Sequence, residues 1–456
     1  MIRQDFDEKA IAQAVQAALL RLGVATSAEL QRATGKSQAS MSRALAELAP
    51  QVVAIGRARA RRYILPQPIL GRSGEQPLFV TVASGHSTRW GTLFHLEGQR
   101  VHVASIDNGY QLTTQGALPW FLEPLRPQGF LGRLRGLSMG FGDANPESWT
   151  LDQVLYTLLS HEHDNPGAFT LGDERGELLP EAPVDPVARG RYYDEIARDI
   201  TKAPRAGSSA GGEQPKFLAH INLPSGYERL IVKFSPPRGT PFGERWHDLL
   251  HTEHLAGAVL RAHGFAAATT RILQSERHTY LESVRFDRVG AFGKRHVVPL
   301  GAIHRAWVAG PQQHWAVTAN SLSARGYLST DDAAKIATIR EFGRLIGNTD
   351  MHFGNLSLLV DDLQKLSSPQ FHLAPIYDML SMAYKPGEFR DDLGYAQLPE
   401  PRPPLGDAGE WEQALKMARE FWMSLADSPA VSAGMRAVAG SNLKTVETCI
   451  SSKTAK

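Results

Sequence analysis

The feature that most constrains this chain is a lysine in the middle of an apolar strand. The run 230–234 (LIVKF) has the composition of a buried strand, interrupted only by Lys233. Burying an ammonium group is costly unless it meets an anion, such as a carboxylate or a phosphate. The helical pattern at 247–262 follows this strand and carries Glu253. The fold must therefore bring an anion to Lys233, and Glu253 is available to supply it.

A glycine-rich segment precedes that strand. Residues 207–217 read GSSAGGEQPKF, and apolar residues follow them. Small residues let backbone N–H groups approach phosphate oxygens, because no side chain stands in the way. On its own such a stretch is more often a flexible turn. Together with the strand lysine it predicts a nucleotide site, with contacts expected from Gly211, Gly212, Gln214, Lys216, Lys233 and Glu253.

A second group of polar residues follows a helical pattern that runs from 330 to 346. The loop 347–355 (GNTDMHFGN) places Asp350 and Asn355 in the spacing D-x-x-x-x-N of a kinase catalytic loop. In that loop the aspartate accepts the substrate hydroxyl proton and the asparagine holds Mg²⁺. Asp378 follows a short apolar strand and adds a second oxygen ligand for Mg²⁺.

Each of these residues has a simpler explanation when taken singly. Asp350 is suited to a turn at the end of a helix, and Asp378 to a helix cap. A strand lysine, a helix glutamate, an aspartate loop and a second carboxylate in this order are the parts of a kinase. The order predicts a two-lobed, kinase-like α+β fold that uses ATP and Mg²⁺.

The N-terminal segment, 1–66, has a different character. Residues 1–65 carry a net charge of +5, whereas the remaining residues sum to −3. Three short helical patterns are followed by a strand at 52–55, a basic run at 57–62 and a strand at 63–65, which predicts a winged helix-turn-helix. The alternative is a helical protein–protein module. The side chains expected to contact DNA are Gln38, Ser40, Ser42 and Arg43 from the third helix and Arg57, Arg59, Arg61 and Arg62 from the wing, where the alternate arginines 57, 59 and 61 are expected on one strand face.

The rest of the chain carries less chemistry. A Pro/Gly-rich break near residue 70 leads to short strand patterns, so 77–200 is predicted to be β-rich. Residues 201–300 then form the N-lobe portion with the lysine, and 301–456 the helical C-lobe, whose stretch 408–450 is predicted to be an amphipathic packing helix. One cysteine excludes a disulfide framework. A polar start and the absence of any long apolar run predict a cytoplasmic protein without a membrane segment.

These motifs together resemble the HipA family of serine/threonine kinase toxins. The resemblance covers most of 77–430, and the added N-terminal domain is similar to the longer YjjJ-type branch of that family. The residues that carry it are the segments SSAGGEQPKF, IVKF, FDR (286–288), NTDMHFGNLS and YDMLS.

The resemblance implies a role for each matched residue. Lys233 would bind the ATP phosphates, Asp350 would act as the base, and Asn355 with Asp378 would hold Mg²⁺. A serine of the glycine-rich loop would be autophosphorylated and switch the kinase off; Ser209 matches best, with Ser208 beside it. Asp287 and Arg288 are expected to support the catalytic loop.

The resemblance also implies partners. Family members phosphorylate protein serines, including those of aminoacyl-tRNA synthetases, and are usually restrained by a separate DNA-binding antitoxin. Here a DNA-binding module is fused to the chain, which leaves the need for a separate antitoxin open.

Three alternatives remain at this point. One is a transcription regulator whose kinase-like body senses nucleotide without transferring phosphate. Another is a small-molecule phosphotransferase of the aminoglycoside or choline kinase type, which shares the D-x-x-x-x-N loop. The third, a zinc hydrolase built on His247, His251 and His254, lacks a carboxylate base.

Overall fold

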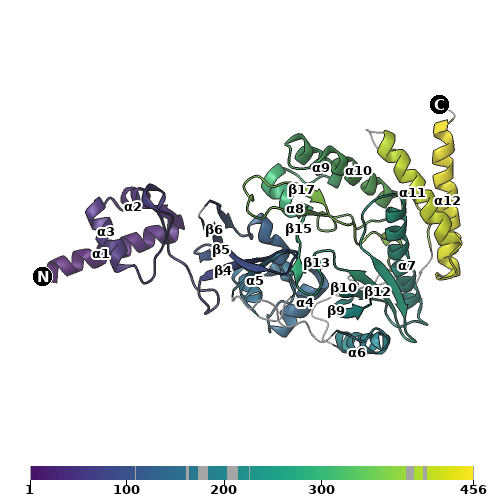
Figure 1. The fold of residues 1–456 in the computed structure, drawn as a ribbon, viewed down its shortest axis with the longest axis horizontal. Coiled ribbons are helices and arrows are strands. Elements are labelled where there is room, and N and C mark those ends of the chain that lie inside the picture. Colours follow the sequence, from purple (N-terminus) through teal and green to yellow (C-terminus); the bar gives the residue numbers. More distant parts are fainter. Residues whose placement is uncertain are drawn as a thin grey trace.

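The computed structural model describes residues 2–107, 109–160, 164–172, 183–202, 214–224, 226–386, 395–403 and 408–454. Figure 1 shows an elongated molecule in which a small N-terminal domain projects from a larger body. The last two helices lie at the opposite end of the molecule. Within the described residues, the arrangement is the predicted two-lobed α+β fold with an N-terminal winged-helix domain.

The N-terminal domain packs three helices against a small antiparallel sheet of order β1-β3-β2. A capping box between Thr26 and Glu29 begins the second helix, and Gly35, with φ +68°, ends it. Val15, Leu30 and Met41 form the centre of its core. The elements are α1 (Ile2–Leu22), β1 (Val24–Thr26), α2 (Ser27–Thr34), α3 (Gln38–Glu47), β2 (Val53–Ile55) and β3 (Arg62–Ile64).

The next part is a five-stranded antiparallel sheet of order β7-β6-β5-β4-β8. Its aromatic core includes Trp90, Phe121 and Phe169, whose rings contact one another. Its elements are β4 (Glu75–Thr81), β5 (Ser87–Leu96), β6 (Arg100–Ser105), β7 (Gln111–Gln115), η2 (Trp120–Leu125), α4 (Gly129–Ser138), α5 (Leu151–Leu158) and β8 (Phe169–Leu171).

A four-stranded antiparallel sheet of order β11-β12-β10-β9 carries the strand lysine. Tyr193 and Ala197 of α6 share a core with Phe217 and Val232 of this sheet, so the packing groups α6 with it. Helix α7 begins six residues before the predicted start, because Thr240 caps it and Pro241 fits its first turn. The elements are α6 (Arg189–Lys202), β9 (Lys216–Leu223), β10 (Gly226–Phe234), α7 (Pro241–Ala262), β11 (Thr270–Gln274) and β12 (Thr279–Val284).

The remaining part is mostly helical and shares one continuous core with the five-stranded sheet. The predicted helix at 408–450 is two helices, because Pro429 lies in the turn between them and supplies no backbone N–H to continue the first. The elements are β13 (Arg288–Val289), β14 (Gly293–Lys294), β15 (His296–Pro299), α8 (Leu300–Ile303), η4 (His304–Val308), α9 (Trp315–Ala324), α10 (Thr330–Leu345), β16 (Ser357–Val360), β17 (Phe371–Leu373), α11 (Ala408–Ala426) and α12 (Ala433–Thr454).

None of the helices in the described ranges is long and apolar enough to cross a membrane.

Candidate active site

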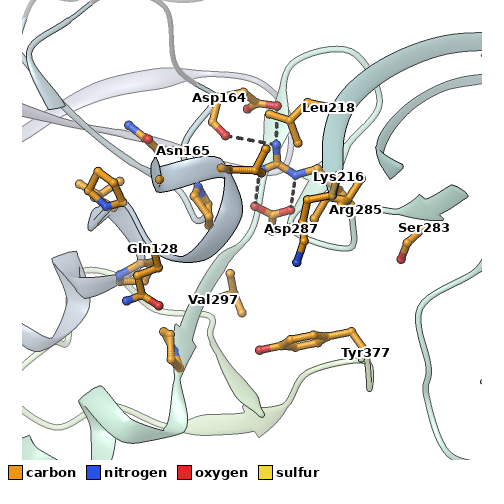
Figure 2. A pocket seen from close by; sticks show the side chains of 18 of the residues that line it. Gln128, Asp164, Asn165, Lys216, Leu218, Ser283, Arg285, Asp287, Val297 and Tyr377 are labelled. Atoms are coloured by element: carbon orange, nitrogen blue, oxygen red, sulfur yellow. Dashed lines mark hydrogen bonds and ion pairs between the residues drawn. The ribbon is translucent and has the colours of Figure 1, made fainter. Parts of the chain in front are cut away.

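A cavity of about 630 Å³ lies where the lysine-bearing sheet, the five-stranded-sheet part and the helical part meet. Strand residues Leu218, Ile231 and Val297 line it, and Tyr377 and Lys216 also point into it, as Figure 2 shows for those that it labels. Helix α4 supplies another part of the wall through Leu131 and its neighbours. The volume is in the range of pockets that hold a nucleotide-sized ligand.

Lys233 meets two carboxylates at one end of this cavity. Its strand, β10, is paired with β9 on one side and β12 on the other, so the lysine is only 5% exposed. Its Nζ lies 2.6 Å from Oε1 and 2.7 Å from Oε2 of Glu253, and it also donates to Oδ1 of Asp378. The structure therefore brings together three residues from β10, α7 and the segment after β17. The anion that the sequence requires for Lys233 is therefore present as two carboxylates, Glu253 and Asp378.

Charge interactions set the protonation of this cluster. Burial acts to lower the pKa of Lys233, but Asp378 and Glu253 raise it above its ordinary value. Burial raises the pKa of Glu253, and Lys233 offsets only part of that change. Burial also acts to raise the pKa of Asp378, but Lys233 and then Lys216 hold it at about 2. Lys233 and Asp378 are therefore both charged at neutral pH.

The backbone around Asp378 is held in an unusual conformation. Asp378 has φ +53°, a region that non-glycine residues rarely adopt and that is common at functional sites. The hydroxyl of Tyr377 donates to the carbonyl of Gly354 and is paired with Ser357 Oγ at 2.7 Å. Asn348 Nδ2 donates to the carbonyl of Asp378 at 3.4 Å. These bonds fasten the backbone around Asp378 to the loop at 347–355 and to Ser357 just after it.

The loop itself presents Asp350 to solvent. Helix α10 ends before Gly347, whose φ of +73° turns the chain into the loop. The Asp350 amide donates to Asn348 Oδ1 at 3.0 Å, and Asn355 Nδ2 donates to the Asp350 carbonyl at 2.8 Å. The side chain of Asp350 is 51% exposed, and His352 Nε2 lies 4.0 Å from its Oδ1. The carboxylate can therefore receive a proton from an external hydroxyl.

Asp378 and Asn355 each carry an oxygen atom that could hold a magnesium ion. Asn355 uses its nitrogen to hold the loop, so its amide oxygen is the atom that can face a cation. Oxygen ligands of this kind, with one or two carboxylates and the phosphates of a nucleotide, are what Mg²⁺ prefers.

Two of the three histidines considered for zinc are hydrogen-bonded to other protein groups. His247 bonds Thr279 and the Ala430 carbonyl, and His254 bonds Thr270. Among the residues that the structure describes, no cluster of three or more potential metal ligands forms.

Asp287 lies in the wall of the cavity and bonds Arg288, and the two side chains contact a different segment from the one expected. Asp287 accepts from Arg285, Arg288 and the Gly167 amide, and Arg288 also bonds Asp164. In the described part of the chain, the bonds recorded for these two side chains reach 164–167 and not the loop at 347–355. Three arginines and two carboxylates join the strand ends to the five-stranded-sheet part, and Figure 2 shows Arg285, Asp287 and Asp164 of this group. Support of the catalytic loop by Asp287 and Arg288 stays a prediction.

The glycine-rich segment is placed only in part. Ser208, Ser209, Gly211 and Gly212 lie outside the described residues. Gln214 precedes β9, and Lys216 begins it, directly opposite Lys233 in the strand register. Both lysines line the cavity, so it carries two cations at the end where Asp378 lies.

The side chains expected to contact DNA are mostly exposed. On α3, Gln38, Ser42 and Arg43 are exposed and Ser40 is half-buried, while Arg43 pairs with Glu8 at 2.9 Å.

The predicted arrangement of the wing arginines on one strand face is wrong. Residues 58–60 form a single 3-10 turn between β2 and β3, and Gly56 and Ala58 both have positive φ, so the chain turns where a strand was expected. Arg57, Arg61 and Arg62 are exposed around this turn; the side chain of Arg59 lies outside the described ones.

Sequence reasoning missed several residues of the cavity. Asp164 and Arg285 are 121 residues apart, and nothing local marks them as partners. Tyr377 appeared only as part of a motif, although its hydroxyl ties two loops together. The α4 wall carried no chemical signal at all.

Comparison with known proteins gives five likenesses, three from sequence and two from solved structures. The chain matches the model of the HipA-like C-terminal domain over residues 208–442 and that of the YjjJ-like toxin middle domain over 72–178. It is 32% identical over 441 residues to the toxin YjjJ of Escherichia coli K12, which covers 92% of this chain and 94% of that protein.

Two solved structures are also similar to it. One is HipA of Shewanella oneidensis MR-1, in a complex of that toxin–antitoxin system with HipB and operator DNA, with a TM-score of 0.48 and 16% identity over 81% of this chain and 96% of that one. The other is the proinflammatory kinase CtkA of Helicobacter pylori, with a TM-score of 0.37 and 13% identity over 53% of this chain and 91% of that one.

Proposed function

This chain belongs to the HipA family, among its YjjJ-type toxins, and we propose that it is an ATP- and Mg²⁺-dependent serine/threonine protein kinase. Family membership makes it a toxin of a toxin–antitoxin system with a kinase-like body. The observation that carries the proposal is the meeting of Lys233 with Glu253 and Asp378 beside the loop that holds Asp350. A lysine held between a helix glutamate and a metal-binding aspartate is how kinases hold the phosphates of ATP.

In this proposal the nucleotide occupies the cavity with its phosphates at Lys216 and Lys233. The apolar side chains that would contact the base are Leu218, Ile231, Phe286, Val297 and Tyr377. Asp378 and the amide oxygen of Asn355 would hold Mg²⁺, which when bound neutralises charge on the phosphate oxygens.

Asp350 would act on the substrate. A serine hydroxyl oxygen attacks the γ-phosphorus, the new O–P bond forms as the bond to the β–γ bridging oxygen breaks, and ADP leaves. Asp350 accepts the hydroxyl proton, since its carboxylate is exposed at the loop surface. Lys233 meets the charge that develops on the transferred group, and Glu253 keeps Lys233 in place.

The finer parts of the function rest on the resemblance. We propose autophosphorylation of Ser209 or Ser208, DNA binding through α3 and the turn at 57–62, and a protein substrate such as an aminoacyl-tRNA synthetase. Whether a separate antitoxin is needed depends on how far the fused domain replaces it.

One observation favours the alternative of a nucleotide-sensing transcription regulator. Ile64 of the N-terminal domain shares a small core with Phe94 and Leu96 of β5. Arg100 of β6 also donates to the carbonyls of Leu20 and Arg21, at the end of α1. The DNA-binding domain is thus fastened to the body, as a regulator coupled to nucleotide binding would require.

The test is phosphopeptide mass spectrometry of the full chain after incubation with ATP and Mg²⁺, beside an Asp350→Asn variant. Phosphate on Ser208 or Ser209 in the parent and none in the variant supports the kinase. No phosphate in either protein, with nucleotide bound to both, contradicts it and favours the regulator.

A further inference from the structure

Helix α7 faces two ways. Glu253 points to the lysine-bearing sheet, whereas Asp248, five residues earlier, contacts the C-terminal part of the chain. Residues five apart on a helix lie about 140° around its axis, so the two carboxylates serve different neighbours. In Figure 1, α7 lies beside α11, with α12 beyond it, at the end of the molecule away from the N-terminal domain.

Asp248 is fully buried. Within the described residues it forms no ion pair with a lysine, arginine or histidine. Its Oδ1 accepts from the Ser432 amide at 2.8 Å, and its Oδ2 accepts from Ser432 Oγ at 2.6 Å and from the Tyr395 hydroxyl. Ser432 in turn caps α12 by accepting from the Met435 amide at 3.1 Å. A buried carboxylate held by several short donors is a strong and directional contact.

Tyr395 is held from a second side. Arg245 lies about one turn before Asp248 on α7, and its guanidinium is 3.5 Å from the centre of the Tyr395 ring. Arg245 also donates to the Tyr384 carbonyl at 3.1 Å. Asn442 of α12 donates to the Tyr384 hydroxyl at 2.7 Å, and its Oδ1 accepts from the Leu398 amide at 3.1 Å. The chain on both sides of 387–394 is therefore fastened to α7 and α12.

The same segment reaches the reaction centre. It begins at Asp378, and the Ser381 amide donates to Thr252 Oγ1 at 3.4 Å, next to Glu253 on α7. The Ala383 amide donates to the Gly347 carbonyl at 2.9 Å, at the start of the catalytic loop. Contacts from α7 thus fix the segment at Ser381, Tyr384 and Tyr395.

We propose that Asp248 and Tyr395 are a positioning pair, which sets the register between α7 and the segment after Asp378 so that Lys233, Glu253 and Asp378 converge. Neither residue lies in the cavity wall, and they act through the backbone they hold. This inference rests on the proposed kinase function. In kinases, the helix that carries the glutamate and the segment after the metal-binding aspartate must both be in place for phosphoryl transfer.

The test uses the full chain with three variants. Tyr395→Phe removes the hydroxyl but keeps the ring over Arg245, and Asp248→Asn removes the charge. The control is Glu420→Gln, which removes the charge from a different contact, the 2.8 Å pair of Glu420 on α11 with His263, the residue that follows α7. Where Asp248→Asn fails to fold, Tyr395→Phe decides the outcome.

Two readouts separate this proposal from the kinase function. The first is hydrogen exchange of the amides at 376–386 and 247–262 without nucleotide, which needs no activity. We expect faster exchange in both positioning variants and none of this change in the control. The second is kinase turnover, for which we expect kcat to fall about 10- to 100-fold with the KM for ATP nearly unchanged, because small misplacements of reacting groups cost rates of that size.

Parent-like exchange in Tyr395→Phe and Asp248→Asn overturns the proposal, as does an equal loss of kcat in the control. Faster exchange with unchanged kcat in an active parent also overturns it. If the parent transfers no phosphate, the kinase function fails separately, and hydrogen exchange alone decides whether the pair sets the register.

Discussion

Two buried charge clusters each place side chains in the wall of the same cavity, and they differ in composition. The first joins one cation, Lys233, to two carboxylates, Glu253 and Asp378. The second joins three cations to two carboxylates, and its members are Arg229, Arg285, Arg288, Asp164 and Asp287. By formal charge, the first cluster is net negative and the second is net positive.

The difference lies in how many oxygens the protein itself uses. In the arginine cluster, both oxygens of Asp164 and both of Asp287 accept from protein donors. In the lysine cluster, Asp378 has only Oδ1 bonded among the described contacts, and its side chain is 28% exposed. A satisfied cluster joins parts of the fold, whereas a carboxylate with an oxygen to spare can bind a cation.

The largest effect should come from breaking the arginine cluster. Asp164→Asn leaves Arg285 and Arg288 with too little negative charge in a buried place, so we expect a loss of about 3–5 kcal/mol in the free energy of unfolding. Urea denaturation of the parent and the variant measures it. A loss below about 1 kcal/mol, the level of an exposed ion pair, would contradict the structural role of this cluster.

Breaking the lysine cluster should affect chemistry more than folding. Asp378→Asn removes the excess charge but leaves Lys233 paired with Glu253, so the fold is expected to persist. We expect the rate of phosphate transfer to fall about 10²- to 10³-fold, the usual effect of removing one charge-stabilising group from an active site. Initial rates and thermal unfolding of the same preparations measure the two effects. An equal loss of stability in both cluster variants would erase the distinction between them.

The lysine cluster was the part that sequence could predict. Lys233 in an apolar strand requires an anion, and Asp350 and Asn355 have the D-x-x-x-x-N spacing of a kinase catalytic loop. These patterns involve residues close in sequence, so they can be recognised without knowledge of the fold. The helix with Glu253 follows in sequence and packs beside the strand, as the kinase order requires.

The arginine cluster and the wing were beyond sequence reasoning for a physical reason. Asp164 meets Arg285 and Arg288 only because the five-stranded-sheet part packs against the strand ends, and no periodicity records that contact. At 57–62, alternating arginines suggested a strand, but local backbone conformations with positive φ made a turn. Patterns of charge do not fix backbone dihedral angles.

Lowering the pH should reduce the stability that the lysine cluster contributes, because it protonates Asp378. Its pKa in the folded protein is about 2, below the ordinary value of 3.8, so its charge stabilises the fold above pH 4. That contribution is lost as the pH falls from about 4 to about 2, where the unfolded state binds the proton more readily. Urea unfolding across this range should show a smaller loss in Asp378→Asn than in the parent. Identical pH profiles would mean that the lysine cluster does not hold this carboxylate ionised.

The smallest effect is expected at an exposed pair, Arg43 with Glu8, which serves as the solvent-facing counterpart of both clusters. Its side chains are 61% and 42% exposed, so water screens the attraction. Arg43→Ala should therefore change the free energy of unfolding by only about 0.2–1 kcal/mol. If α3 binds DNA, the same change should weaken binding and lower the slope of log affinity against log salt by about 1.

Glu8→Gln is the matched variant, because it releases Arg43 from its partner and should strengthen DNA binding while leaving stability within the same narrow range. An Arg43→Ala variant that loses stability but binds DNA normally would assign this arginine to the packing of α1 on α3. The exposed Arg43–Glu8 pair and the buried cluster of Asp164 would then both serve to stabilise the fold. DNA affinity is therefore the measurement that decides whether Arg43 serves DNA binding or the stability of the fold.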